Sequence, residues 1–197
     1  MERHRIRIIV LLAVAMGRTG SNVHGAPAPF VLSKDHTDVV FEISHVGYSM
    51  KHGWFRDMVG TLSFDAEKPE LSSLDVTIKS GSIDTNNAQR DKDLSGPNFL
   101  DTVKSPDLHF VSTRVIRSGN QALEVEGNLT LHGITKPMVL HTKLNKLGPN
   151  PFTHSATVGF TAHGSLMRSD FGIGSMIPLL GDEVSITIDA EFDAANR

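Results

Sequence analysis

The chain has 197 residues, with 19 Lys and Arg against 22 Asp and Glu, 10 His and no Cys. This length accommodates one domain with a sizeable core. The lack of cysteine excludes disulfides, thiol catalysis and cysteine-based zinc sites, and the slight acidic excess leaves no basic footprint for nucleic acid.

The first 25 residues have the features of a secretory signal peptide. Three arginines within the first seven residues precede an apolar run at residues 8–16, and the small residues Val23 and Gly25 follow. A basic end, a short apolar core and a small-residue exit are typical of such signals. The apolar run is also about half the ~20 residues that a membrane-spanning helix needs. We therefore predict cleavage after Gly25, with a buried N-terminal helix as the alternative.

Export would leave a chain of 172 residues that is more acidic than the full sequence. The segment removed carries four Arg and one Glu, so 15 basic and 21 acidic residues remain. An exported protein without disulfides depends on its core and sheet alone, which fits a bacterial periplasm better than a eukaryotic secreted domain. We expect residues 26–29 to be a linker and residues 30–197 to be the folded domain.

After the linker, apolar and polar residues alternate almost everywhere with a period of two. This alternation is typical of antiparallel strands with one buried and one solvated face. About eight such strands are predicted, at residues 39–44, 58–65, 74–79, 108–113, 123–132, 138–144, 156–162 and 184–192.

Two stretches break this period. Residues 86–101 contain a helix start, with Asn86 or Asn87 as the cap, and Gly96-Pro97 as the stop, so one or two short helices are predicted. Residues 166–182 contain several Gly and Met residues and are predicted to form a long loop.

Eight antiparallel strands favour a closed barrel, because closure removes the exposed sheet edges. With water outside, the apolar faces point inward, and a barrel of this size is filled by side chains or holds one small ligand. Small inward residues are expected to leave room for a guest; they are Gly60, Gly127, Ala156, Ala162 and Ala190. A two-sheet sandwich is the alternative.

Signatures of catalysis are scarce. No Gly-x-Ser-x-Gly elbow or glycine-rich phosphate loop is present, and the histidines lack metal-binding spacings. Hydrogen bonding at strand ends is the favoured role of His36 and His45. Asp91, Asp93 and Asp101 are expected on a solvated helix face rather than in acid–base catalysis, and Asp170 is expected to pair with Arg168 as a loop ion pair.

The stretch GNLTLHGITKP at residues 127–137 is predicted to be a barrel hairpin rather than an active site. Gly127 is expected to leave lumen space, and His132-Gly133 to begin the corner. Residues 135–136 would then lie in the turn, with Pro137 at the start of the returning strand.

The ten phenylalanines, against one Trp and one Tyr, include several at inward positions of the predicted strands. For any single ring, ordinary core packing is the simpler role. Together with the small residues, however, these aromatic inward faces suit an apolar guest. The rings concerned are Phe41, Phe64, Phe110, Phe160 and Phe192.

These motifs, taken in order, resemble those of the YceI-like family of exported bacterial lipid-binding proteins. The similarity covers roughly residues 30 to 193. The matching pieces are HTDVVFEISH at 36–45, GWF at 53–55, FD at 64–65, SIDTNN at 82–87, RD at 90–91, FLD at 99–101, SP at 105–106, Phe110, GNLTLHGITKP at 127–137, RSDFGI at 168–173 and DEV at 182–184. One departure is visible, because Asp93 stands where the family usually has a histidine in its helix.

The resemblance implies a lipocalin-like, all-β fold: an extended eight-stranded antiparallel barrel with an apolar channel. It also implies a periplasmic protein that is not an enzyme and that takes up an isoprenoid chain, such as a polyprenyl phosphate or a quinone, or another long amphiphile. Some members look dimeric, so a homodimer is left open. We expect no cofactor, no metal and no membrane-spanning segment.

We therefore hypothesise a protein that binds, stores or carries an isoprenoid or similar lipid. A redox accessory protein that hands quinone to a membrane cytochrome, and a stress-response interaction protein with a filled barrel, are the alternatives. The residues expected to bind the ligand are Phe41, Ile43, Met58, Leu62, Phe64, Phe99, Phe110, Leu129 and Phe160, with Arg90, Lys92 and Arg168 as candidates for headgroup contact at the mouth.

Overall fold

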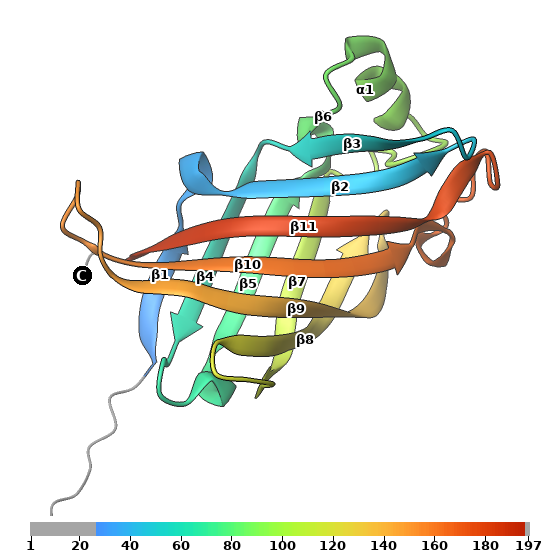
Figure 1. Ribbon diagram of the computed structural model, residues 1–197. Coiled ribbons are helices and arrows are strands. Elements are labelled where there is room, and N and C mark those ends of the chain that lie inside the picture. Colours follow the sequence, from blue (N-terminus) through green and yellow to red (C-terminus); the bar gives the residue numbers. More distant parts are fainter. Residues whose placement is uncertain (1–26, 196–197) are drawn as a thin grey trace, which may run out of the picture.

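The computed structural model describes residues 27–195, so the predicted signal peptide lies outside the described residues. Within that range the chain is mostly extended (Figure 1). Its strands are β1 (Ala28–Leu32), β2 (Asp38–His45), β3 (Ser49–Phe55), β4 (Met58–Phe64), β5 (Ser73–Lys79), β6 (Ile83–Asp84), β7 (Asp107–Arg117), β8 (Ala122–Leu131), β9 (Ile134–Pro149), β10 (Ala156–Met167) and β11 (Leu180–Ala194).

Helical structure in the described range is limited to short segments. The α-helix α1 (Ala88–Leu94) begins at Asn87, whose side chain accepts a hydrogen bond from the Arg90 N–H. This confirms the helix and the cap that the sequence predicts. The 3₁₀ turns are η1 (Lys34–His36), η2 (Pro69–Leu71), η3 (Ser80–Ser82) and η4 (Arg168–Phe171).

Eight of the strands close into an antiparallel barrel, as the alternation predicts. The ring runs β1-β4-β5-β7-β8-β9-β10-β11, and β11 returns to β1 through the pairs Phe30↔Ala194 and Leu32↔Phe192. This ring of hydrogen-bonded neighbours is continuous, and residues 27–195 form no second, separate sheet, so the sandwich alternative does not hold.

The strand that completes the ring is not one of the eight predicted from the pattern. β1 lies between β4 and β11, and it begins at Ala28, inside the stretch expected to be a linker. The predicted strand at residues 39–44 belongs instead to β2, which pairs with β11 outside the ring. The chain leaves the ring at η1, which lies between β1 and β2. Before it, β1 pairs with β4 and β11; after it, β2 pairs with β11 and β3.

β2, β3 and β6 extend the sheet beyond the ring. β3 pairs with β2 along its whole length, and the two-residue β6 pairs with the end of β3. Figure 1 shows β2 and β3 beside β11, with α1 above β3 at one end of the molecule. The segment at residues 168–179, predicted to be part of a long loop, contains η4 and turns and lies between β10 and β11.

Four of the five predicted inward aromatic residues lie inside the barrel ring, and the fifth, Phe41, is on β2 outside it. Phe64, Phe110, Phe160 and Phe192 are buried in one apolar cluster, and Phe41 packs half-buried against a second cluster. Phe160 contacts Phe64 edge-on, with ring centroids 5.3 Å apart. Such edge-to-face geometry is the arrangement that aromatic quadrupoles favour.

The hairpin at residues 127–137 is tighter than predicted. His132 and Gly133 form the whole turn, with φ of 53° and 75°, and Leu131 pairs directly with Ile134. Positive φ at both positions is the signature of a two-residue hairpin turn that follows the sheet twist. Thr135 and Lys136 therefore lie in β9 rather than in the turn.

The small inward residues do not all leave space. Gly127 lies under the Phe110 ring, and a Cβ built there would come within 2.7 Å of Phe110 Cε2. The space beside Gly60 is occupied in the same way by the Val76 side chain, 2.9 Å from a Cβ built at Gly60. Ala156 is exposed and does not face the barrel core. The expectation that Gly60 and Gly127 widen the lumen is wrong, because neighbouring side chains occupy the vacated space. Ala162 and Ala190, by contrast, do line the space inside the barrel.

We predict that Gly127→Ala destabilises the fold by about 1–3 kcal/mol, the usual cost of overpacking. The added methyl would meet both the Phe110 ring and the Val111 carbonyl oxygen, 2.6 Å away. Urea unfolding measures the change. Gly159→Ala is the matched control, since a Cβ there meets nothing closer than 4.0 Å. Equal unfolding midpoints for the two variants would contradict the packing described here.

Candidate functional site

An apolar cavity of about 360 Å³ lies inside the barrel and extends beneath β2 and β3. Ligand pockets in proteins span roughly 300–1,000 Å³. The inward residues of the barrel strands form most of its wall. Further wall residues come from β2, from α1 (Leu94) and from the segment after α1 (Phe99 and Leu100).

All the residues predicted to bind the ligand or its headgroup lie on this wall, except Lys92. The aromatic and aliphatic members are Phe41, Ile43, Met58, Leu62, Phe64, Phe99, Phe110, Leu129 and Phe160. Arg90 and Arg168 also reach the wall, whereas Lys92 is exposed and is not part of it. The structure thus brings these residues together around one space; whether each contacts a ligand stays a prediction.

The polar part of the wall carries positive charge only. Lys51, Arg90 and Arg168 line the cavity, together with His45 and His52. None of the wall residues in the described part of the chain is an aspartate or a glutamate. An apolar cavity with cations and no carboxylates is electrostatically suited to an anionic group.

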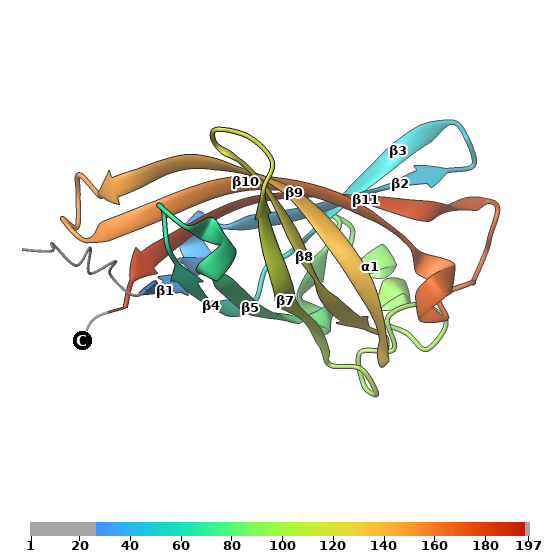
Figure 2. The ribbon, with the colours of Figure 1, turned by 90° about the horizontal axis from the view of Figure 1, so that it is seen from below.

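These cations belong to one end of the cavity. Lys51 and Gly53 share a face of β3, and a Cβ on Gly53 would lie 2.9 Å from Thr85, which is the hydrogen-bond partner of Arg90. Arg168 binds the Leu180 carbonyl, and Leu180 pairs with His45 on β2. The β2–β3 hairpin, α1 and the η4 segment therefore form this end together, as both ribbon views show (Figures 1 and 2).

Arg90 is oriented by Thr85 rather than by a carboxylate. Its Nε donates to Thr85 Oγ1 at 2.7 Å, and its Nη2 donates to the Thr85 carbonyl at 2.6 Å. Thr85 is itself buried, and both its N–H and its hydroxyl donate to Asp91. Asp91 therefore positions Thr85, which is a different role from the solvated helix face predicted for it.

Arg168 is buried, with 5% of its surface exposed, and its guanidinium is held by backbone carbonyls. Nε donates to Gly181 at 2.7 Å, Nη1 to Ile173 at 2.9 Å and Nη2 to Leu180 at 3.2 Å. Burial lowers the pKa of Arg168, an effect that the charge of Asp182 opposes. The predicted ion pair with Asp170 is absent from the described residues.

The η4 segment has a second anchor in His132, at the hairpin turn of β8 and β9. His132 Nδ1 lies 3.0 Å from the Phe171 carbonyl oxygen. Phe171 and Ile173, with 3% and 5% of their surfaces exposed, point into the barrel core. His132 is therefore a structural contact, which agrees with the reading of this hairpin as non-catalytic.

Of the other two acidic residues predicted on a solvated helix face, Asp93 is confirmed there and Asp101 is not. Asp93 accepts a hydrogen bond from Gln89 at 2.9 Å on the exposed side of α1, away from the cavity wall. Asp101 is buried rather than solvated, and it pairs with Lys104 at 3.0 Å. Position 93, where the family usually has a histidine, thus faces outward in this chain.

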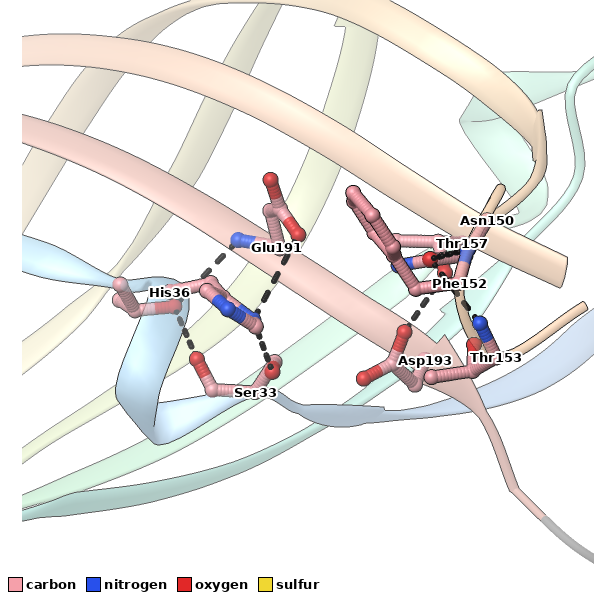
Figure 3. Close-up of polar contacts among 9 residues, drawn as sticks. Ser33, His36, Asn150, Phe152, Thr153, Thr157, Glu191 and Asp193 are labelled. Atoms are coloured by element: carbon pink, nitrogen blue, oxygen red, sulfur yellow. Dashed lines mark hydrogen bonds and ion pairs between the residues drawn. The ribbon is translucent and has the colours of Figure 1, made fainter. Parts of the chain in front are cut away.

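The two histidines assigned to strand ends differ from each other. His36 Nδ1 lies 3.2 Å from Ser33 Oγ and 3.9 Å from Glu191, as Figure 3 shows, which confirms hydrogen bonding there. His45 lines the cavity instead. Lys51 was missed because β3, which reads SMKHGWF, lacks the apolar alternation that marks the other strands. Thr85 was missed because it follows β6, which has only the two residues ID and shows no alternation.

Two further findings concern only residues 27–195. No helix in that range is long and apolar enough to cross a membrane. No three histidine or acidic side chains in that range are grouped so that they would hold a metal ion.

A closed antiparallel barrel around an apolar cavity is the architecture that lipocalins use to hold one small ligand. The family model of the YceI-like domain matches residues 30–192. The chain is also 44% identical, over 190 residues, to the UPF0312 protein of Pseudomonas syringae pv. tomato, a match covering 95% of this chain and 97% of that one. This protein therefore belongs to the YceI-like family.

Solved structures show the same fold. The YceI protein of Campylobacter jejuni is 29% identical, with a TM-score of 0.70 and coverage of 78% of this chain and 90% of that one. A polyisoprenoid binding domain from Saccharophagus degradans has a TM-score of 0.65 at 12% identity, covering 86% and 99% of the two chains. The predicted resemblance and the predicted barrel are thus both confirmed.

We predict that Arg168→Met lowers stability by about 3 kcal/mol, because it leaves buried carbonyl oxygens without donors. Thermal unfolding and limited proteolysis of residues 172–179 measure the effect. Arg114→Met, at an exposed position on β7, is the control. An Arg168→Met protein with unchanged unfolding temperature and protease resistance would show that the carbonyl contacts do not hold this segment.

Proposed function

We propose that this protein binds a long isoprenoid, or a similar amphiphile with an acidic headgroup, inside the barrel, and stores or carries it. The single observation that carries the proposal is an apolar cavity whose wall has cations at one end and, among the described residues, no carboxylate. A chain buried there gains about 0.8 kcal/mol per CH₂, so few polar contacts are needed for binding. The headgroup would lie toward Lys51, Arg90 and Arg168.

Several features support this proposal. The structural neighbour from Saccharophagus degradans is a polyisoprenoid binding domain, although at 12% identity it is a guide to fold rather than to ligand. The cavity, at about 360 Å³, is far larger than the ~30 Å³ share of one water, which argues against a filled barrel. The predicted signal peptide supports a periplasmic location.

Between the two isoprenoids considered, the wall favours a polyprenyl phosphate over a quinone. A quinone headgroup is neutral, and burying cations beside it would leave their charge uncompensated. A phosphate provides charge-assisted hydrogen bonds to guanidinium and ammonium groups. Delivery of quinone to a membrane cytochrome has no supporting feature in the described residues, and it remains the competing outcome of the binding test.

Native mass spectrometry of protein purified from its own periplasm, followed by lipid extraction, tests the proposal. We expect a co-purifying lipid, or uptake of an added polyprenyl phosphate. Ala162→Phe should reduce uptake at least tenfold, because Ala162 lies on the wall and a ring there would occupy the cavity. Val59→Phe, on the exposed face of β4, is the matched control.

The outcome that contradicts the proposal is equally specific. Repeated absence of co-purifying lipid, with no uptake of polyprenols, polyprenyl phosphates or quinones, would rule out the carrier function. Uptake that Ala162→Phe and Val59→Phe reduce equally would place the ligand outside the cavity.

A second prediction addresses the headgroup. Lys51→Met should weaken binding of a polyprenyl phosphate about tenfold, the size of one hydrogen bond to a charged group. Binding of the polyprenol with the same chain should change little. Lys51 suits this test because it lies on the wall without a carboxylate partner among the described residues. A titration with a fluorescent analogue measures both affinities, and equal losses for the two ligands would contradict a headgroup role.

A further inference from the structure

Six large apolar side chains are exposed together at the cationic end of the cavity. Tyr48, at the tip of the β2–β3 hairpin, is 90% exposed, and Leu179 and Met176, in the β10–β11 loop, are 55% and 54% exposed. The remaining members have 37–45% of their surfaces exposed. We call the six the mouth patch: Val46, Tyr48, Met50, Met176, Ile177 and Leu179.

The two segments of the mouth patch are joined by backbone contacts. The Val46 N–H donates to the Leu179 carbonyl at 2.7 Å, and Leu180 pairs with His45 at the end of β2. Figure 2 shows the β2–β3 hairpin and the β10–β11 loop at the same end of the molecule. The patch is therefore one surface built from two loops, unlike the single exposed valines on the outer barrel face, such as Val59.

Both segments are free of charged residues. Residues 46–50 read VGYSM and residues 171–181 read FGIGSMIPLLG, in a chain of which 21% is charged. Covering these loops with an apolar or interfacial medium would desolvate no carboxylate or ammonium group. Tyrosine, with an apolar ring and a polar tip, is enriched where protein meets the lipid headgroup region.

The mouth patch adjoins the wall of the cavity. His45 and Leu180 both line the cavity. His45 is next in sequence to Val46 of the patch, and Leu180 is next to Leu179. His45 is also exposed, so the wall reaches the surface at this place. Whatever covers the mouth patch therefore lies against the end of the cavity where an amphiphile would enter or leave.

We propose that the mouth patch docks on the surface of a phospholipid bilayer, with Tyr48, Met176 and Leu179 inserted at the headgroup level. The inference rests on the proposed function, because a protein that carries a long isoprenoid must collect it from, or return it to, a lipid phase. Docking by the mouth patch lets the isoprenoid pass between the bilayer and the cavity without crossing water. A second copy of the protein is the competing occupant, and its outcome is part of the test.

The test is flotation with vesicles of phosphatidylethanolamine and phosphatidylglycerol in equal parts, using the full mature chain. We expect wild-type protein to float with the vesicles and the triple variant Tyr48→Ser/Met176→Ser/Leu179→Ser to bind at least tenfold more weakly. Phe152→Ser is the matched control. Phe152 is a 90% exposed aromatic residue at the β9–β10 tip, at the opposite end of the twelve-residue β10. It should bind as the wild type does.

A second readout separates docking from ligand binding. The triple variant should take up polyprenyl phosphate from detergent solution with unchanged affinity, while its rate of uptake from vesicles falls at least tenfold. If wild-type protein floats but takes up no lipid, the proposed function fails and the docking proposal stands.

Several results would overturn docking. They are no flotation of the wild type, equal flotation of the triple variant, or equal loss in Phe152→Ser. Light scattering that shows a wild-type dimer, dissociated only by the triple variant, would assign the mouth patch to a second copy. Circular dichroism confirms that the variants are folded; should the triple variant unfold, Tyr48→Ser alone, at the most exposed position, provides the same comparison.

Discussion

Ring closure between β1 and β11 is the constraint on which the rest of the structure depends. Three residue pairs, from Phe30↔Ala194 to Leu32↔Phe192, join the first strand of the described chain to the last. Without them β1 and the part of β11 that pairs with it would each keep an exposed edge, and the apolar inner faces would open to water. Closure turns a sheet with one apolar face into a barrel with an apolar interior. The width of that interior, and so the room for a cavity, is set by the number of strands in the ring.

Most of this architecture could be predicted from the sequence, because a half-buried antiparallel strand has a period of two that residues such as Val184, Ile186 and Ile188 display directly. β1, β3 and the two-residue β6 were not predicted, and the physical reasons differ for β1 and β3. β1 carries Pro29 and is only five residues long. β3 contains Lys51 on its cavity face and Gly53 under the Phe41 ring, so its inward positions do not look apolar.

The candidate site was predictable in its apolar part and much less so in its polar part. Inward aromatic and aliphatic residues are assigned by alternation, and all of those proposed reach the wall. Polar groups are assigned by tertiary neighbours instead. Sequence adjacency paired Arg168 with Asp170, whereas the fold places three carbonyl groups around Arg168 and uses Asp182 to bind Ser169, whose hydrogen bonds lower the pKa of Asp182.

The buried Arg168 also explains how an uncharged loop can stay exposed beside an apolar cavity. Left free, the segment from Phe171 to Leu180 would bury its apolar side chains in the cavity that it borders. Arg168 and His132 instead fix the carbonyls of Phe171, Ile173, Leu180 and Gly181. Phe171 and Ile173 are thereby directed into the core, while Met176 and Leu179 are held at the surface. One set of backbone contacts thus keeps the apolar cavity open and the mouth patch at the surface.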